Sequence, residues 1–190
     1  MQTIYTDGSC VLEFDPVTKK KAKINSPGGY GVVFRDRAVA FGGVRDSTNN
    51  IMSLSSILFG LRFIRDNREE FPDGAIVINS SEYAVAMSGL YAKIKPELIP
   101  GSEINYCLTP FSKNKNLIQT IHKCLAELES SGMVVVLKQV SSGMVYGHRL
   151  AGLVARRNAR DYQDKKLKLK LRKEAFKKRQ RKRDAASALR

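Results

Sequence analysis

The chain has 190 residues, 43% of them hydrophobic, and a formal net charge of +15 at pH 7. This length and composition predict a folded domain with a sizeable core and exclude a disordered chain. Its three cysteines form no Cys-x-x-Cys pair and have no histidine at ligand spacing, which argues against a zinc site and indicates free thiols in a reducing compartment. No apolar run reaches the ~18 residues of a membrane span, and the N-terminus leaves no room for a signal peptide. We therefore expect a soluble intracellular protein, cytoplasmic or nuclear.

The first part of the chain has the pattern of an antiparallel meander. The run Ile4-Tyr5-Thr6-Asp7-Gly8-Ser9 predicts a strand that presents one carboxylate at its exit. Residues 11–27 contain three consecutive lysines and two prolines and predict a loop or a long connection. A glycine-opened strand over 28–34 and a returning strand over 38–45 complete the meander.

The rest of the chain alternates helices and strands. Residues 46–50 are rich in N-cap residues and predict the start of a helix. The further elements expected are a strand over 75–78, a helix over 83–90, an irregular segment over 93–112, an amphipathic helix over 116–130, a strand over 133–140 and a last helix from about 148. This order implies an α/β fold with a mixed five-stranded sheet, three antiparallel strands plus two parallel ones, flanked by helices.

The positive charge is concentrated at the C-terminal end. Residues 165–190 hold 13 Lys or Arg against two acidic residues, a net charge of +11, which leaves +4 for the rest of the chain. A basic arm on a nearly neutral globule indicates a polyanionic partner, most often nucleic acid; a solubilising or disordered tail without a ligand is the alternative. The densest stretch fits a phosphate-binding arm or a nuclear import signal, and its basic residues are Lys177, Lys178, Arg179, Arg181, Lys182 and Arg183.

The tail is expected to follow a domain of residues 1–162, and residues 163–190 are either a helical extension or disordered. Within it, Lys and Leu alternate over 166–171, which fits a strand period better than a helix or marks a weak docking edge for a partner.

Five motifs occur in an order and spacing that is similar to the ribonuclease H family, over about residues 1–160. They are Tyr5-Thr6-Asp7-Gly8-Ser9, Gly28-Gly29-Tyr30-Gly31-Val32-Val33, Thr48-Asn49-Asn50-Ile51-Met52, Asn79-Ser80-Ser81-Glu82-Tyr83 and the closing segment 140–155. The resemblance implies the ribonuclease H-like sheet, flanked by helices and followed here by the basic tail.

The same resemblance implies that catalytic acids are missing. The family uses four acids, of which Asp7 is present, whereas the other three positions hold Ser53, Ser80 and Gly152. The histidine of the family's closing loop also has no clear counterpart. Hydrolysis of this type needs two Mg²⁺ about 3.5–4 Å apart, held by several anionic oxygens. We therefore expect a pseudoenzyme with no catalytic residues, no metal and no cofactor.

Other ionisable residues near this edge change the expectation of a pseudoenzyme only slightly. His148 and Arg149 should lie close by and make the edge less suitable for cations. Glu82 could replace a lost acid in a rearranged metal site, which leaves an active Mg²⁺-dependent ribonuclease H as a third hypothesis. An ordinary first-turn acid is the preferred interpretation of Glu82, because its side chain should face another direction.

Residues that contact nucleic acid in the family are present here as Gly8, Ser9, Asn49 and Asn50. Short amides and a glycine backbone can approach the wide, shallow minor groove of an A-form duplex and reach its 2′-hydroxyls. The alternative is that the asparagines only cap a helix and that Gly8-Ser9 only turns the chain.

Two main hypotheses follow. The first is a non-catalytic ribonuclease H-like protein that binds RNA or an RNA-containing duplex through the former substrate groove and the basic tail. The second is a structural or scaffold component of a ribonucleoprotein, in a ribosome-like or replication assembly, with protein partners. His122, on an amphipathic helix, is expected at the surface or at its boundary.

Overall fold

The computed structural model describes residues 1–11, 26–90 and 114–187, and within them the mixed five-stranded sheet that the sequence predicts. The strand order is β3-β2-β1-β4-β5, with antiparallel pairing among the first three strands and parallel pairing of β4 with both β1 and β5. The strands are β1 Gln2–Cys10, β2 Ser26–Phe34, β3 Arg37–Ser47, β4 Ala75–Asn79 and β5 Val135–Gln139. Most of the expected loop at 11–27 and the whole irregular segment at 93–112 lie outside the described residues.

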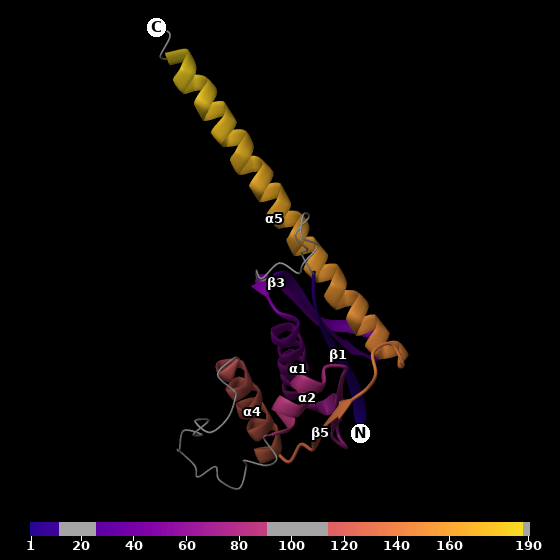
Figure 1. Ribbon diagram of the computed structural model, residues 1–190. Coiled ribbons are helices and arrows are strands. Elements are labelled where there is room, and N and C mark those ends of the chain that lie inside the picture. Colours follow the sequence, from indigo (N-terminus) through magenta and orange to yellow (C-terminus); the bar gives the residue numbers. More distant parts are fainter. Residues whose placement is uncertain (12–25, 91–113, 188–190) are drawn as a thin grey trace.

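Helices cover both faces of this sheet (Figure 1). They are α1 Asn49–Asp66, α2 Glu82–Gly89, α4 Lys115–Ser130 and α5 Tyr146–Ser187, with a short 3₁₀ helix at Arg68–Glu70. The alternation of side chains along β2 shows which helix lies on which face. Tyr30 stacks on Phe59 of α1 with ring centroids 4.4 Å apart, whereas the neighbouring Gly31 faces α5.

Glycine allows α5 to lie directly on β2. A Cβ at Gly31 would sit 2.5 Å from the Ala151 carbonyl oxygen, and a Cβ at Gly29 would overlap the Ala155 carbonyl oxygen. Alanine recurs every four residues along this side of α5, so the helix presents small side chains to the glycines. The glycine-rich motif therefore has a packing function: it brings α5 close enough to position its side chains at the end of β1.

The main core lies between the other sheet face and α1 and α4. Ile4, Val32 and Val77 of the sheet are fully or almost fully buried there. Leu54, Ile57 and Leu61 of α1 and Ile121 of α4 pack into the same cluster. His122 is also buried, with 1% of its surface exposed and Nε2 2.9 Å from the Met87 carbonyl oxygen. The expectation of a surface or boundary histidine is wrong because α2 packs over this position.

The last helix is continuous through the expected domain boundary at residues 162 and 163. Its 42 residues make it about 63 Å long at 1.5 Å per residue, and its C-terminal part projects away from the sheet (Figure 1). The segment 166–171 is helical, so the strand-like interpretation of its Lys-Leu alternation is wrong. Lys and Leu are both good helix formers, and the preceding helix continues through them without a partner strand. None of the described helices is long and apolar enough to span a membrane.

Candidate nucleic-acid interface

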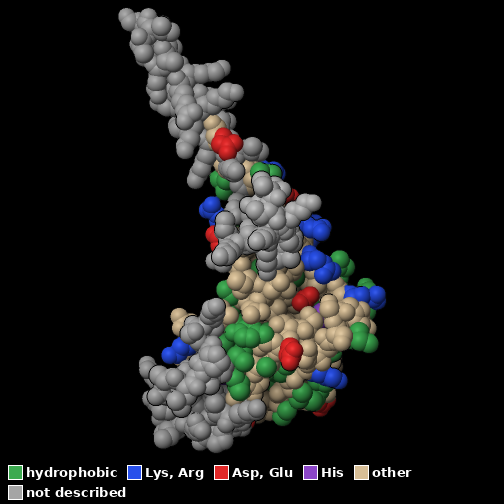
Figure 2. Space-filling view, viewed as in Figure 1, with side chains coloured by type: hydrophobic (Ala, Val, Ile, Leu, Met, Phe, Trp, Pro, Cys, Tyr) green, Lys and Arg blue, Asp and Glu red, His purple; other side chains and the backbone are tan. Residues whose placement is uncertain are grey.

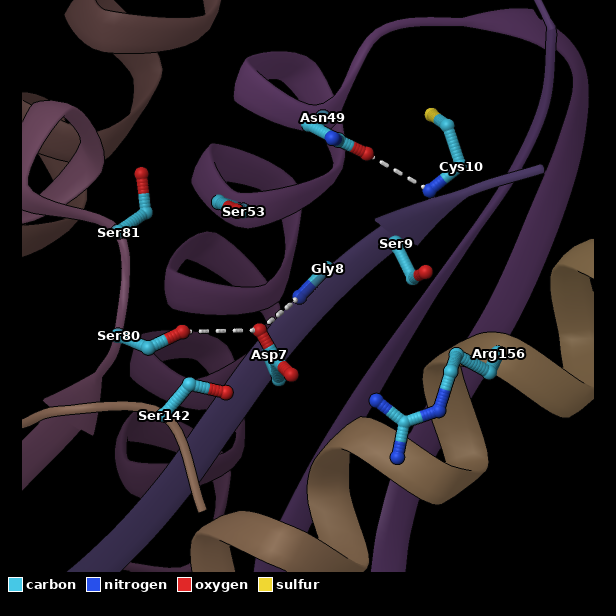
Figure 3. Close-up of a pocket in the computed structure, with 10 residues that line it drawn as sticks. All are labelled: Asp7, Gly8, Ser9, Cys10, Asn49, Ser53, Ser80, Ser81, Ser142 and Arg156. Carbon is cyan, nitrogen blue, oxygen red and sulfur yellow. Dashed lines mark hydrogen bonds between the residues drawn. The ribbon is translucent and has the colours of Figure 1, made fainter. Parts of the chain in front are cut away.

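A polar pocket of about 320 Å³ opens where β1 ends (Figure 3). The parallel strands β1, β4 and β5 end at the same edge of the sheet, so residues far apart in sequence meet there. The residues that line it are Asp7, Gly8, Ser9, Cys10, Asn49, Ser53, Ser80, Ser81, Ser142 and Arg156.

Asp7 is the acidic residue in this lining, and its side chain is mostly buried. Its Oδ1 accepts a hydrogen bond from the Gly8 N–H at 2.9 Å and a long one from the Ser80 hydroxyl at 3.4 Å. His148 Nε2 lies 4.0 Å from the same oxygen. Burial raises the pKa of Asp7 above its usual value, against the opposing effects of His148, Gly8, Ser80 and Arg156. The fold therefore disfavours a charged carboxylate at this position.

The three positions where the resemblance calls for further acids surround Asp7. Ser53 and Ser80 line the same pocket. A Cβ at Gly152 would lie 2.7 Å from Asp7 Oδ2, so any side chain there would point at the carboxylate. Glu82 is exposed and is not part of the lining.

The positive charge in the pocket comes from a residue that the sequence reasoning missed. Arg156 of α5 lines the pocket, whereas Arg149 is exposed and lies over the ring of Tyr146, 5.9 Å from its centroid. Arg149 packs beside Gly143, next to the pocket residue Ser142, without lining the pocket itself, and His148 faces Asp7. Arg156 is one helical turn after Gly152, and residues four apart share a helix face. The four-residue spacing from Gly152 could have identified Arg156 from the sequence.

The donor set does not fit a pair of magnesium ions. It offers one carboxylate and several neutral hydroxyls, with a guanidinium beside them. Among the described parts of the chain, no group of three or more His, Cys, Asp or Glu could hold a metal ion. Two divalent cations at close distance need anionic oxygens for coordination and for neutralisation, and one carboxylate supplies neither in sufficient number.

The four candidate groove residues have different surroundings. Gly8, Ser9 and Asn49 line the pocket, whereas Asn50 is exposed outside it. Thr48 caps α1 by accepting from the Ile51 N–H at 3.3 Å, so the alternative that the two asparagines only cap the helix is wrong. The Asn49 Oδ1 instead accepts from the Cys10 N–H at 2.8 Å and ties the start of α1 to the end of β1.

Gly8 has a structural reason to be glycine. A Cβ there would overlap the backbone of Met52 and Ser53, so the residue allows α1 to cross β1 closely. Its backbone can still face the pocket that it lines.

A buried asparagine, Asn79, fixes the β4 side of the pocket. Its Nδ2 donates to the Thr6 carbonyl oxygen at 3.1 Å and to the Thr6 hydroxyl at 2.8 Å, and it lies 3.0 Å from Ser56 Oγ. Its Oδ1 accepts from the Ser81 N–H at 2.8 Å, which orients the turn that carries Ser80. The sequence reasoning assigned no function to Asn79.

The six basic residues predicted in the tail lie far along α5 from the pocket. Lys177, Lys178, Arg179, Arg181, Lys182 and Arg183 all fall within α5. At 1.5 Å per residue they are roughly 30–40 Å along the helix axis from Arg156. The exposed basic surface begins well before them, and Figure 2 shows Lys and Arg side chains along the side of the molecule that α5 occupies. Its described exposed members in the helix are Arg149, Arg156, Arg157, Arg160, Lys165, Lys168 and Arg172.

Comparison with known proteins identifies the fold. No protein-family model and no curated protein sequence matches the chain. LC9-RNase H1, a type 1 RNase H with the type 2 active-site motif, is similar over 84% of this chain and 72% of its own, at 19% identity and a TM-score of 0.56.

Two similar structures contain nucleic acid. The foamy viral protease-reverse transcriptase in complex with RNA/DNA hybrid matches 83% of this chain at 14% identity and a TM-score of 0.56, and this chain spans 20% of that one. LC11-RNase H1, isolated from compost and solved in complex with RNA/DNA hybrid, matches 85% of this chain and 98% of its own at 16% identity and a TM-score of 0.51. The chain described here therefore has the ribonuclease H-like fold.

Proposed function

We propose that this protein binds RNA or an RNA-containing duplex without cleaving it, through the pocket edge at the end of β1 and the basic surface of α5. The observation that carries the proposal is the composition of the pocket, in which hydroxyls and a guanidinium surround one carboxylate. Two structures with the same fold were solved with RNA/DNA hybrid, which supports nucleic acid as the ligand class.

The pocket edge suits an A-form duplex. The side chains of Ser9 and Asn49 are short and polar, and Gly8 adds a backbone without a side chain. Such groups can enter a wide, shallow minor groove and hydrogen-bond to 2′-hydroxyls, which bulkier side chains could not do.

The α5 surface supplies the charge for polyanion binding. The segment 165–190 carries +11, and basic residues neutralise phosphates and release counterions from the duplex. This contribution is independent of sequence, acts over a longer range and weakens steeply with salt.

The absence of cleavage in this proposal follows from the donor set. One carboxylate with neutral hydroxyls cannot hold and neutralise two Mg²⁺, and the guanidinium of Arg156 adds a positive charge where the cations would need negative ones.

The proposal is tested by equilibrium binding of the full chain to a matched RNA/DNA hybrid, double-stranded RNA, double-stranded DNA and single-stranded RNA at two salt concentrations. We expect tighter binding to the two A-form duplexes than to double-stranded DNA, and weaker binding of all four at high salt. Equal affinity for all four ligands at both salt concentrations would contradict a contribution from the pocket edge.

A second candidate function is a scaffold in a ribonucleoprotein, favoured by the apolar surface around β5. This strand is at the edge of the sheet, and Val134 and Val136 are 60% and 43% exposed. Such an edge suits a protein partner. If neutralising the tail abolishes all duplex binding while pocket substitutions change nothing, the scaffold hypothesis is favoured.

A further inference from the structure

Arg156 has the geometry of a ligand-binding side chain. It reaches from α5 towards Asp7 across the opening of the pocket (Figure 3). Within the described part of the chain it forms no ion pair and no hydrogen bond, and its interaction with Asp7 is electrostatic only. A guanidinium presents five N–H donors in a planar fork that matches phosphate oxygens. Arg156 thus directs an unused anion-binding group into the pocket.

Serine hydroxyls from several elements face the same space. Ser9 comes from β1, Ser53 from α1 and Ser142 from the loop before α5. None of these three hydroxyls makes a hydrogen bond to a described residue, whereas Ser80 donates to Asp7 and Ser81 accepts from the Ala84 N–H at 3.2 Å. A hydroxyl can donate to an anion, and several convergent ones satisfy the oxygens that one arginine leaves open.

Gly152 keeps the guanidinium open. A Cβ at this position would lie 2.7 Å from Asp7 Oδ2 and 3.4 Å from Arg156 Nη1, so a side chain here would fill the gap between the two charged groups. An acidic side chain would also neutralise Arg156. With glycine, the charged groups that the described residues direct to the pocket are the guanidinium and the Asp7 carboxylate, with His148 buried behind the carboxylate.

From these contacts we propose that the pocket binds one backbone phosphate of the nucleic acid directly, with Arg156 as the charged donor and the hydroxyls of Ser9, Ser53 and Ser142 as neutral donors. This inference rests on the proposed function and specifies its central contact. The bound phosphate fixes the position of the duplex on the domain, and the rest of α5 adds affinity without fixing position. Asp7 repels the phosphate and weakens the site.

Because Asp7 repels the phosphate and Arg156 attracts it, neutralising the two residues should change duplex affinity in opposite directions. The full chain is titrated with an RNA duplex of fixed length in EDTA, as wild type and as the Asp7→Asn, Arg156→Gln and Arg157→Gln variants. Arg157 is the matched control, because it is a neighbouring exposed arginine on the same helix that does not line the pocket. Far-ultraviolet circular dichroism and thermal unfolding establish that each variant is folded.

We expect Arg156→Gln to weaken binding by about tenfold, as for loss of a hydrogen bond to a charged group. It should lower the slope of log affinity against log salt by about 0.7–0.9, the value for one phosphate contact. Arg157→Gln should change both quantities less, and Asp7→Asn should tighten binding severalfold.

Three results would contradict either the phosphate site or the proposed function on which it rests. Equal effects of the two arginine substitutions, or weaker binding by a folded Asp7→Asn variant, would overturn the phosphate site while leaving duplex binding intact. Failure of the wild-type chain to bind any duplex would overturn the proposed function itself.

Discussion

At the scale of single residues, Asp7 is a buried carboxylate, and the described residues that line its pocket include no second acid. Burial raises its pKa, so the folded state favours the neutral form more than the unfolded chain does. Above pH 3.8, its ordinary value, the charged form lowers the stability of the fold.

Replacing Asp7 with asparagine should therefore raise the melting temperature at pH 7. The asparagine Oδ1 can still accept from the Gly8 N–H, and no buried charge remains. The gain should fade as the pH falls from the raised pKa of the folded state towards 3.8, and it should be absent below 3.8, where the carboxyl is neutral in both states. Asp73→Asn, at an exposed position, is the control. A melting temperature at pH 7 that falls in Asp7→Asn would show that the charge stabilises the fold.

His122 provides a pH-dependent prediction. Burial lowers its pKa below 6.5, against the opposing effect of its hydrogen bond to the Met87 carbonyl oxygen. As the pH falls below 6.5, the unfolded chain takes up a proton that the folded state resists, so the free energy of unfolding decreases. His122→Gln keeps an N–H donor and should lose this part of the decrease. Urea unfolding at pH 7.5 and 5.5 measures the free energy of unfolding of the wild type and of His122→Gln. The same pH dependence in both proteins would refute the contribution of His122.

At the scale of elements, close packing of α5 on β2 sets the position of Arg156. Gly31→Ala places a methyl group 2.5 Å from the Ala151 carbonyl oxygen, and overpacking of this kind typically costs about 1–3 kcal/mol. Gly89→Ala is the matched control, since nothing lies within 4 Å of its added Cβ and alanine favours the helix. We expect chemical denaturation to show a loss of stability in the first variant and none in the second. Equal stabilities would mean that α5 does not rest on β2 as described.

Most elements could be predicted from sequence because their periodicity and turn residues are local. The strand pattern of 75–78 and the amphipathic pattern of 116–130 both match elements of the structure, β4 and α4. The Lys-Leu alternation at 166–171 misled because six residues are too few to outweigh a helix that extends through them.

The site was harder to predict than the fold because its contacts depend on packing between distant elements. The meeting of Asp7 with the positions of Ser53 and Ser80 follows from strand order and motif spacing. The choice of Arg156 over Arg149 depends on how α5 rotates against the sheet, and the burial of His122 depends on α2. Hydrophobic periodicity alone predicts neither the placement of Arg156 at the pocket nor the burial of His122.

At the scale of the whole molecule, α5 is both a layer of the domain and a basic helix that leaves it. Neutralising the distal positive charge should lower duplex affinity and flatten its salt dependence by about 0.7–0.9 in log–log slope for each phosphate that the variant no longer neutralises. The variant changes Lys177, Lys178, Arg179, Arg181, Lys182 and Arg183 to glutamine. Glutamine is a good helix former, so α5 should persist. An unchanged slope would show that this segment does not touch phosphate.

The claim that the protein binds an RNA-containing duplex without cleaving it is tested most directly by one native gel. The full chain is incubated with end-labelled RNA/DNA hybrid and Mg²⁺, and one half of each sample is then denatured to reveal strand length. The proposed function predicts a shifted band whose RNA strand remains intact at every protein concentration. RNA fragments that accumulate with time and disappear in Asp7→Asn would contradict it, because they would show a working metal site built around that carboxylate.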